Sequence, residues 1–177
     1  MTKKSPPYYI ITGPPGSGKT SLIDQLRQDV NVVNEPARRV LAAQRRIGGE
    51  ATGDQNPALF IEEMLALSAQ DYDGAQGRTV FDRGLPDLLA FAAYYNVLDA
   101  PIRAAIKTRP YRQTVFYLPS WELIYEQDDE RRLDFAGAEA FGTLIRAAYE
   151  ALGYTLVTVP KSTLVARASF VRAYFTD

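Results

Sequence analysis

Residues 8–21 read YYIITGPPGSGKTS, an apolar strand-like run that leads into a glycine-rich turn. The turn matches the pattern G-x-x-x-x-G-K-[ST] at every fixed position. Its glycines let successive backbone N–H groups curl around a phosphate, and the helix predicted after it adds the positive end of its dipole. We expect Lys19 to reach the β- and γ-phosphates of a nucleoside triphosphate, and the hydroxyl of Thr20 to bind Mg²⁺. The predicted nucleotide-binding residues are Gly13, Pro14, Pro15, Gly16, Ser17, Gly18, Lys19, Thr20 and Ser21.

Apolar runs of strand character alternate with helical patterns along the chain. Strands are predicted over residues 8–12, 30–33, 79–82, 114–118 and 154–159. Helices are predicted over residues 17–28, 37–47 and 57–72, between the later strands and after the last one. This alternation predicts an α/β fold with a parallel sheet covered by helices on both faces. The 177 residues are the size of one domain.

Composition narrows the class of protein. The chain has no Cys and no His, which excludes disulfides, thiolate zinc sites, cysteine nucleophiles and Ser-His triads. Lys and Arg number 20 against 21 Asp and Glu, so net charge predicts no general attraction to nucleic acid or membranes. The sequence MTKKSPPYYI has no apolar run typical of a signal peptide. We therefore expect a cytoplasmic protein.

Charged residues follow the second and third predicted strands. In a parallel α/β sheet, ligands bind at the carboxyl ends of the strands. Asp82 follows Thr79-Val80-Phe81 and is predicted either to hold Mg²⁺ or to cap a helix that starts near Pro86. Glu35 is a candidate base for a substrate hydroxyl, with an ordinary surface turn as the alternative. Arg83 is a candidate ligand of the transferred phosphoryl group or of a substrate oxygen.

Two further groups of arginines are candidates for binding anions. Arg131 and Arg132 end the charged stretch YEQDDERR, within residues 120–134, which we predict to form a lid over the triphosphate. A basic helix next to Glu35 carries Arg38, Arg39, Arg45 and Arg46. This helix belongs to the segment 37–72, the predicted substrate-binding region, and Arg38 is its candidate substrate ligand. A solvated basic face is the alternative.

The motifs GPPGSGKT, NEPARR, VFDRGLPD, VFYLP, YEQDDERR and GYTLVTVP occur in this order. Together they resemble the small bacterial "AAA domain" P-loop ATPase and kinase-like proteins. Through that family the chain is similar to the nicotinamide riboside kinase domain of bacterial NAD regulators, and more distantly to deoxynucleoside kinases. The resemblance extends from Tyr8 to about Phe175. It implies the three-layer P-loop NTPase fold, with a five-stranded parallel sheet of order 2-3-1-4-5.

The resemblance to deoxynucleoside kinases also implies roles for single residues. Glu35 would be the base for a sugar hydroxyl, Asp82 a magnesium ligand and Arg83 a phosphate ligand. The lid arginines of those kinases would correspond to Arg131 and Arg132. Gly84 stands where those kinases have Ser, which is a departure from their motif. No length remains for the helical lid domain of a ring motor, and no Asn-Lys-x-Asp motif indicates a GTPase.

These observations favour an ATP- and Mg²⁺-dependent phosphotransferase that acts on a hydroxyl of a small acceptor, for which a nucleoside-like compound is one candidate. A regulatory or accessory ATPase that controls a protein partner is the alternative. An antibiotic- or toxin-directed phosphotransferase is a third hypothesis. The sequence does not identify the acceptor, and it leaves monomer and dimer open. Four aromatic residues could stack on a base or belong to the core: Tyr72, Phe91, Tyr94 and Tyr95.

Overall fold

Four parallel pairings join five strands into one sheet of order β2-β3-β1-β4-β5. The computed structural model describes residues 6–125 and 133–175. The strands are β1 (Tyr8–Thr12), β2 (Asn31–Val33), β3 (Thr79–Asp82), β4 (Thr114–Tyr117) and β5 (Thr155–Thr158). The sequence prediction of a five-stranded parallel sheet in this order is confirmed. Arg131 and Arg132 lie outside the described residues, so their predicted role stays a prediction.

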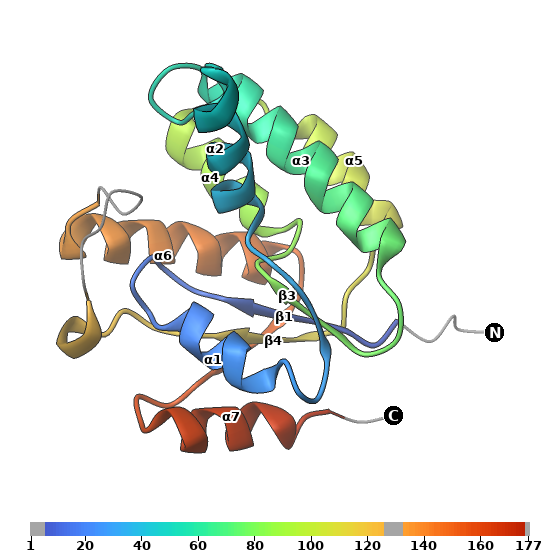
Figure 1. Cartoon of the computed structure of the whole chain (residues 1–177), viewed down its shortest axis with the longest axis vertical. Helices are drawn as coiled ribbons and strands as arrows, with labels where there is room; N and C mark the ends of the chain where they lie inside the picture. Colours follow the sequence, from blue (N-terminus) through green and yellow to red (C-terminus); the bar gives the residue numbers. More distant parts are fainter. Residues whose placement is uncertain (1–5, 126–132, 176–177) are drawn as a thin grey trace.

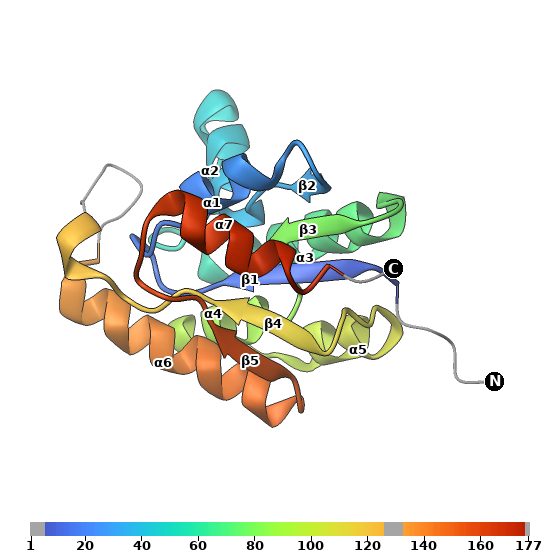
Figure 2. The same cartoon turned by 90° about the horizontal axis from the view of Figure 1, so that it is seen from below.

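Helices cover both faces of this sheet (Figures 1 and 2). They are α1 (Lys19–Leu26), α2 (Pro36–Ile47), α3 (Pro57–Gly74), α4 (Asp87–Tyr95), α5 (Ala100–Thr108), α6 (Phe135–Ala151) and α7 (Leu164–Arg172), with a 3-10 turn at Glu122–Ile124. Helices α1 and α7 pack side by side on one face, and α6 and α4 pack together on the other. This is the three-layer arrangement that the alternation of strands and helices predicts.

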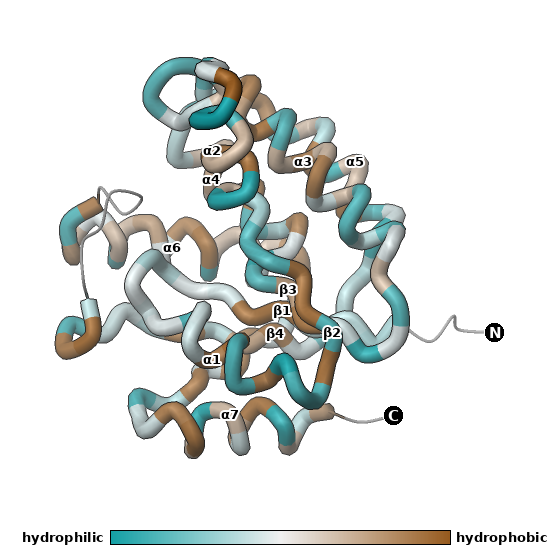
Figure 3. The backbone as a smooth tube through the Cα atoms, viewed as in Figure 1, coloured by the Kyte–Doolittle hydropathy of each residue, from teal (hydrophilic) through white to brown (hydrophobic). Residues whose placement is uncertain are grey.

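The central strand β1 alternates its side chains between two cores. Ile10 belongs to the larger core, which α2 to α6 complete, whereas Tyr9 and Ile11 belong to the smaller core beneath α1 and α7. Successive strand residues point to opposite faces, so a strand covered on both faces must be apolar throughout. Figure 3 shows the hydrophobic colour along β1 and its neighbours, with hydrophilic residues along the outer sides of the helices.

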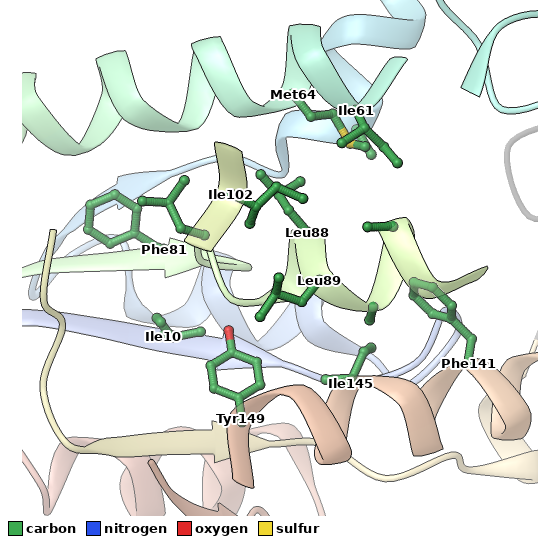
Figure 4. Packing of buried hydrophobic residues seen from close by; sticks show 14 of the residues in the cluster. Ile10, Ile61, Met64, Phe81, Leu88, Leu89, Ile102, Phe141, Ile145 and Tyr149 are labelled. Carbon is green, nitrogen blue, oxygen red and sulfur yellow. The ribbon is translucent and has the colours of Figure 1, made fainter. Parts of the chain in front are cut away.

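Helices α2 to α5 form a helical lobe on the face of the sheet that α6 also covers (Figure 1). Its interior is apolar: Ile61 and Met64 of α3 lie over Leu88 of α4 (Figure 4). The helix boundaries have local causes. Pro57 occupies the first turn of α3, where no N–H is needed, and the side chain of Asn56 accepts a hydrogen bond from the backbone N–H of Leu59.

Two of the differences from the predicted elements are the start of α1 and the length of the fifth strand. The helix begins at Lys19 rather than at Ser17, because Ser17 and Gly18 belong to the preceding turn and Gly18 has a left-handed backbone. The fifth strand is limited to Thr155–Thr158. No helix within the described residues is long and apolar enough to cross a membrane.

The lobe core provides a stability test. Leu88 is 1% exposed, whereas Leu98, just beyond α4, is 88% exposed. We expect Leu88→Ala to lower the free energy of unfolding by about 2–5 kcal/mol, because it leaves a cavity in a packed core. Leu98→Ala should stay within about 0.5 kcal/mol of wild type. Urea unfolding of both variants measures this, and equal effects would contradict the packing described here.

Candidate nucleotide and phosphoryl-transfer site

The turn between β1 and α1 adopts a conformation that its glycines make possible. Gly13 has φ 146°, and a Cβ atom on it would lie 2.2 Å from the carbonyl oxygen of Leu118 at the end of β4. Any side chain at this position would therefore collide with backbone that cannot move aside. The side chain of Tyr125 packs against Gly16 on the other side of the turn. The loop is thus confined between the end of β4 and the segment that follows it.

Lys19, the first residue of α1, folds back across this loop. Its ammonium group donates hydrogen bonds to the carbonyl oxygens of Gly13 at 3.1 Å and Pro14 at 2.9 Å. The side chain is buried, and desolvation together with the charge of Arg83 lowers the pKa of Lys19 to about 8. Lys19 therefore remains a buried cation at neutral pH, a suitable partner for phosphate oxygens.

Asp82, the last residue of β3, is a buried carboxylate. Its Oδ1 has no hydrogen-bond partner among the described residues, and α4 has no side-chain cap at its start, so the capping alternative for Asp82 is wrong. Burial, and then the neighbouring charge of Glu35, raises the pKa of Asp82 to about 7. An unpaired buried carboxylate oxygen is a position that a cation would stabilise.

Thr20 and Asp82 fit a magnesium ion that is bound together with a nucleotide. Mg²⁺ prefers oxygen ligands and is usually held by one or two carboxylates plus substrate phosphates. In the described part of the chain no three acidic side chains gather into a complete metal site. Thr20 lines the cavity, whereas Asp82 is buried and is not among the residues that line it. Thr20 and Asp82, the latter through water, would hold the ion.

Arg83, which follows β3, pairs with two carboxylates: the partly buried Glu35 after β2 and the buried Asp87 of α4. Its Nε donates to Oε1 of Glu35 at 2.9 Å, and its Nη1 donates to Oδ1 of Asp87 at 3.0 Å. Although burial disfavours its charge, Glu35 and Asp87 raise the pKa of Arg83 above its usual value. Arg83 also has φ 71°, a left-handed conformation that a non-glycine residue rarely adopts and that is found at functional sites.

Glu35 lies in this ion pair rather than in a surface turn. Its Oε2 accepts a second hydrogen bond, from Nε of Arg38 at 3.2 Å. Burial opposes the charge of this carboxylate, but Arg83 and Lys19 hold the pKa of Glu35 below its usual value. Glu35 is therefore ionised at neutral pH, as a proton acceptor must be, with each oxygen already accepting from an arginine.

A cavity of about 1570 Å³ runs from the phosphate loop past Glu35 and Arg83 to the space beneath α2 and α3. Its nucleotide side is lined by Lys19, Thr20, Trp121, Ile124 and Arg167, and its far side, which we call the aromatic chamber, by Phe60, Phe91, Tyr94, Tyr95 and Phe141. Tyr72 is a core residue instead, packed edge-on against Tyr8 and Tyr111. Of the basic helix, Arg38 and Arg45 line the cavity, whereas Arg39 pairs with Asp71 and Arg46 is exposed.

Comparison with known proteins identifies the family. Residues 8–167 match the family model described as "AAA domain". The chain belongs to this family. No curated protein matches it. The predicted resemblance to small P-loop ATPase and kinase-like proteins is confirmed by this match and by the solved structures with the same fold.

Two of these structures are kinases by name, and a third contains a nucleotide. Deoxyadenosine kinase from M. mycoides, with the products dCMP and dCDP, has a TM-score of 0.65 at 13% identity, covering 94% of this chain and 96% of that one. Thymidylate kinase from Candida albicans has 0.61 at 16%, covering 97% and 92%. The YorR protein from Bacillus subtilis, in complex with phosphorylated GDP, has 0.58 at 15%, covering 94% of each chain. These likenesses show the fold that this AAA-domain protein shares with them.

Sequence reasoning did not find three residues of this AAA-domain site: Arg167, Trp121 and Asp87. Arg167 of α7 is buried, and its Nη2 donates to the carbonyl oxygen of Ser17 at 3.0 Å. Its guanidinium lies 5.6 Å from the ring centroid of Trp121, a cation–π contact. No local pattern marks either residue, because their partners lie far away in the sequence. The third such residue, Asp87, is discussed below.

The raised pKa of Asp82 makes the stability of the unliganded protein depend on pH. The folded state binds the proton of Asp82 more tightly than the unfolded state does. The contribution of this proton to the free energy of unfolding is therefore complete below pH 4 and is lost as pH rises through about 7. Asp82→Asn removes this dependence. Relative to wild type, the variant should become progressively more stable as pH rises from 4 to 8. Urea unfolding across this range measures the gain; parallel profiles would contradict it.

Proposed function

We propose that this protein is an ATP- and Mg²⁺-dependent phosphotransferase that moves the γ-phosphoryl group to a hydroxyl of a small acceptor. The observation that carries this proposal is the continuity of the cavity. It runs from the phosphate loop, past the Glu35–Arg83 ion pair, into the aromatic chamber beneath α2 and α3. A second compartment on the γ-phosphate side is what a kinase requires and what an ATPase, which needs only a positioned water, does not.

The chamber suits a small planar acceptor. Its aromatic walls offer apolar surfaces for stacking, and Gln44, Asp54 and Gln55 add polar groups to its lining. A nucleoside-like compound combines a flat heterocycle with hydroxyl groups and would match both features. The fold shared with deoxyadenosine kinase and thymidylate kinase supports this class of acceptor. The segment 37–72 would then supply one wall of the acceptor site, with Arg38 as a polar contact.

The residues at the junction of the two compartments have complementary roles in this reaction. Lys19 would bind the β- and γ-phosphates, and Arg83 an oxygen of the transferred group. Glu35 would hold the acceptor hydroxyl and take up its proton, after exchanging one of its arginine hydrogen bonds. The acceptor oxygen then bonds to the γ-phosphorus as the bond to the bridging oxygen of ADP breaks. Mg²⁺, held by Thr20 and Asp82, would neutralise charge on the phosphates.

Lys19→Ala tests nucleotide binding. Because the hydrogen bonds of Lys19 within the described residues go to loop carbonyls and Ser17, its removal should leave the fold intact but abolish measurable binding of Mg-ATP. Calorimetric titration measures binding, and thermal melting checks the fold. Lys107→Ala, which removes an exposed lysine of α5, is the control and should bind ATP like wild type. Unchanged affinity in Lys19→Ala would contradict the assignment of the loop.

Glu35→Gln separates a kinase from an ATPase. The amide can still accept a hydrogen bond from Arg83 but takes up a proton poorly, so phosphoryl transfer should fall about 10²-fold with ATP affinity nearly unchanged. The measurement is ADP release with and without nucleosides and related alcohols. The control is Glu62→Gln, an exposed carboxylate of α3. If no acceptor stimulates ADP release and Glu35→Gln leaves basal hydrolysis unaltered, the regulatory ATPase becomes the better account.

A further inference from the structure

Asp87, the first residue of α4, is a carboxylate buried at the centre of the fold and 1% exposed. Four groups donate hydrogen bonds to it. The hydroxyl of Thr12 and Nη1 of Arg83 donate to Oδ1, at 2.5 and 3.0 Å. The hydroxyl of Tyr149 and the backbone N–H of Gly84 donate to Oδ2, at 2.5 and 2.9 Å. A buried charge is stable only when it is paired and hydrogen-bonded in this way.

The donors come from three separate parts of the fold. Thr12 ends β1 and immediately precedes the phosphate loop, and Gly84 lies in the loop from β3 to α4. Tyr149 extends from α6 with its hydroxyl directed away from its own helix (Figure 4). Burial and the charge of Asp87 raise the pKa of this phenol, so it stays protonated and remains a donor. Asp87 thus links the end of β1, the β3–α4 loop and α6 through hydrogen bonds to a single carboxylate.

Asp87 holds both the side chain and the backbone of the Arg83 segment. It accepts from the guanidinium of Arg83 and from the N–H of the next residue, Gly84, which fixes the left-handed turn at Arg83. Gly84 packs closely against the core, because a Cβ atom on it would lie 2.4 Å from Cδ1 of Ile10. This contact also explains why a serine at position 84, as in the deoxynucleoside kinase motif, would not fit without movement of Ile10.

We propose that Asp87 is a positioning residue, which through its carboxylate holds the guanidinium of Arg83 against the γ-phosphoryl group of a bound nucleotide, with Thr12 and Tyr149 holding Asp87 in turn. Asp87 itself does not touch the nucleotide, since it does not line the cavity, whereas Arg83 does. This inference rests on the proposed function, because it requires a nucleoside triphosphate in the phosphate loop.

The difference in affinity between a triphosphate and a diphosphate tests this role. Calorimetric titration with Mg-ADP and with the Mg complex of the β,γ-imido analogue of ATP gives the triphosphate-to-diphosphate affinity ratio. Arg83→Ala and Asp87→Asn should each lower the ratio about tenfold, the loss of a charge-assisted hydrogen bond, with ADP affinity kept within about twofold. The double variant should lower it no further than Arg83→Ala alone, because Asp87 acts through Arg83.

Milder variants keep the test decisive if Asp87→Asn fails to fold. Tyr149→Phe removes one hydrogen bond to Asp87 and should lower the ratio about threefold. Its matched control is Tyr111→Phe, a tyrosine of the same core whose hydroxyl accepts from the N–H of Leu85 and, in the described structure, makes no hydrogen bond to Asp87. Tyr111→Phe should leave the ratio at the wild-type value. Thr12→Val should behave like Tyr149→Phe, and Thr12→Ser, which keeps the hydroxyl, like wild type.

The outcomes distinguish this inference from the proposed function. If wild type binds neither ligand, the proposed function is wrong, and the role of Asp87 is wrong with it. If wild type binds both ligands but the Asp87 and Tyr149 variants weaken ADP and the triphosphate equally, or change neither, the positioning role alone is wrong. Additive losses in Arg83→Ala combined with Asp87→Asn would likewise overturn it.

Discussion

The buried guanidinium of Arg83, held between Glu35 and Asp87, connects the parts of the molecule on which the candidate site depends. Glu35 comes from the end of β2, Arg83 from the end of β3, and Asp87 from the start of α4. Removing one partner of a buried ion pair typically costs about 3–5 kcal/mol, because the other charge is left uncompensated. The three residues therefore fix one another, and with them the distance between the phosphate loop and the lobe of α2 to α5.

Ionisable side chains of both signs are buried around this ion pair. Lys19 and Arg83 are buried cations, Glu35 and Asp87 are paired anions, and Asp82 is a buried carboxyl group with one unpaired oxygen. In a region of low dielectric, such groups shift one another's pKa values strongly, which is typical of sites prepared for a charged ligand. Lys19 has only carbonyl and hydroxyl partners in the described structure. A triphosphate with its metal would give Lys19 and Asp82 direct partners of opposite charge.

The parts of this site that sequence could predict are those with local signals. The phosphate loop is a contiguous motif, and the meeting of Glu35 with Arg83 follows from their positions at the ends of parallel strands. The sheet order came from the family resemblance. Asp87 has the hydroxyls of Thr12 and Tyr149 as partners, 75 and 62 residues away, and nothing near it in the sequence marks either contact. The left-handed backbone of Arg83 is likewise a consequence of tertiary contacts, since arginine has no intrinsic preference for it.

The contact between Arg167 and Ser17 has a consequence for how this protein is made. The two residues are 150 positions apart, so the phosphate loop is synthesised well before the helix that packs against it. At typical rates of translation this interval is roughly 10–30 s. β1 is also the central strand, and both of its neighbours, β3 and β4, follow it along the chain. On the ribosome, the phosphate loop is therefore translated long before the structure that gives it its shape, and the loop is completed late in synthesis.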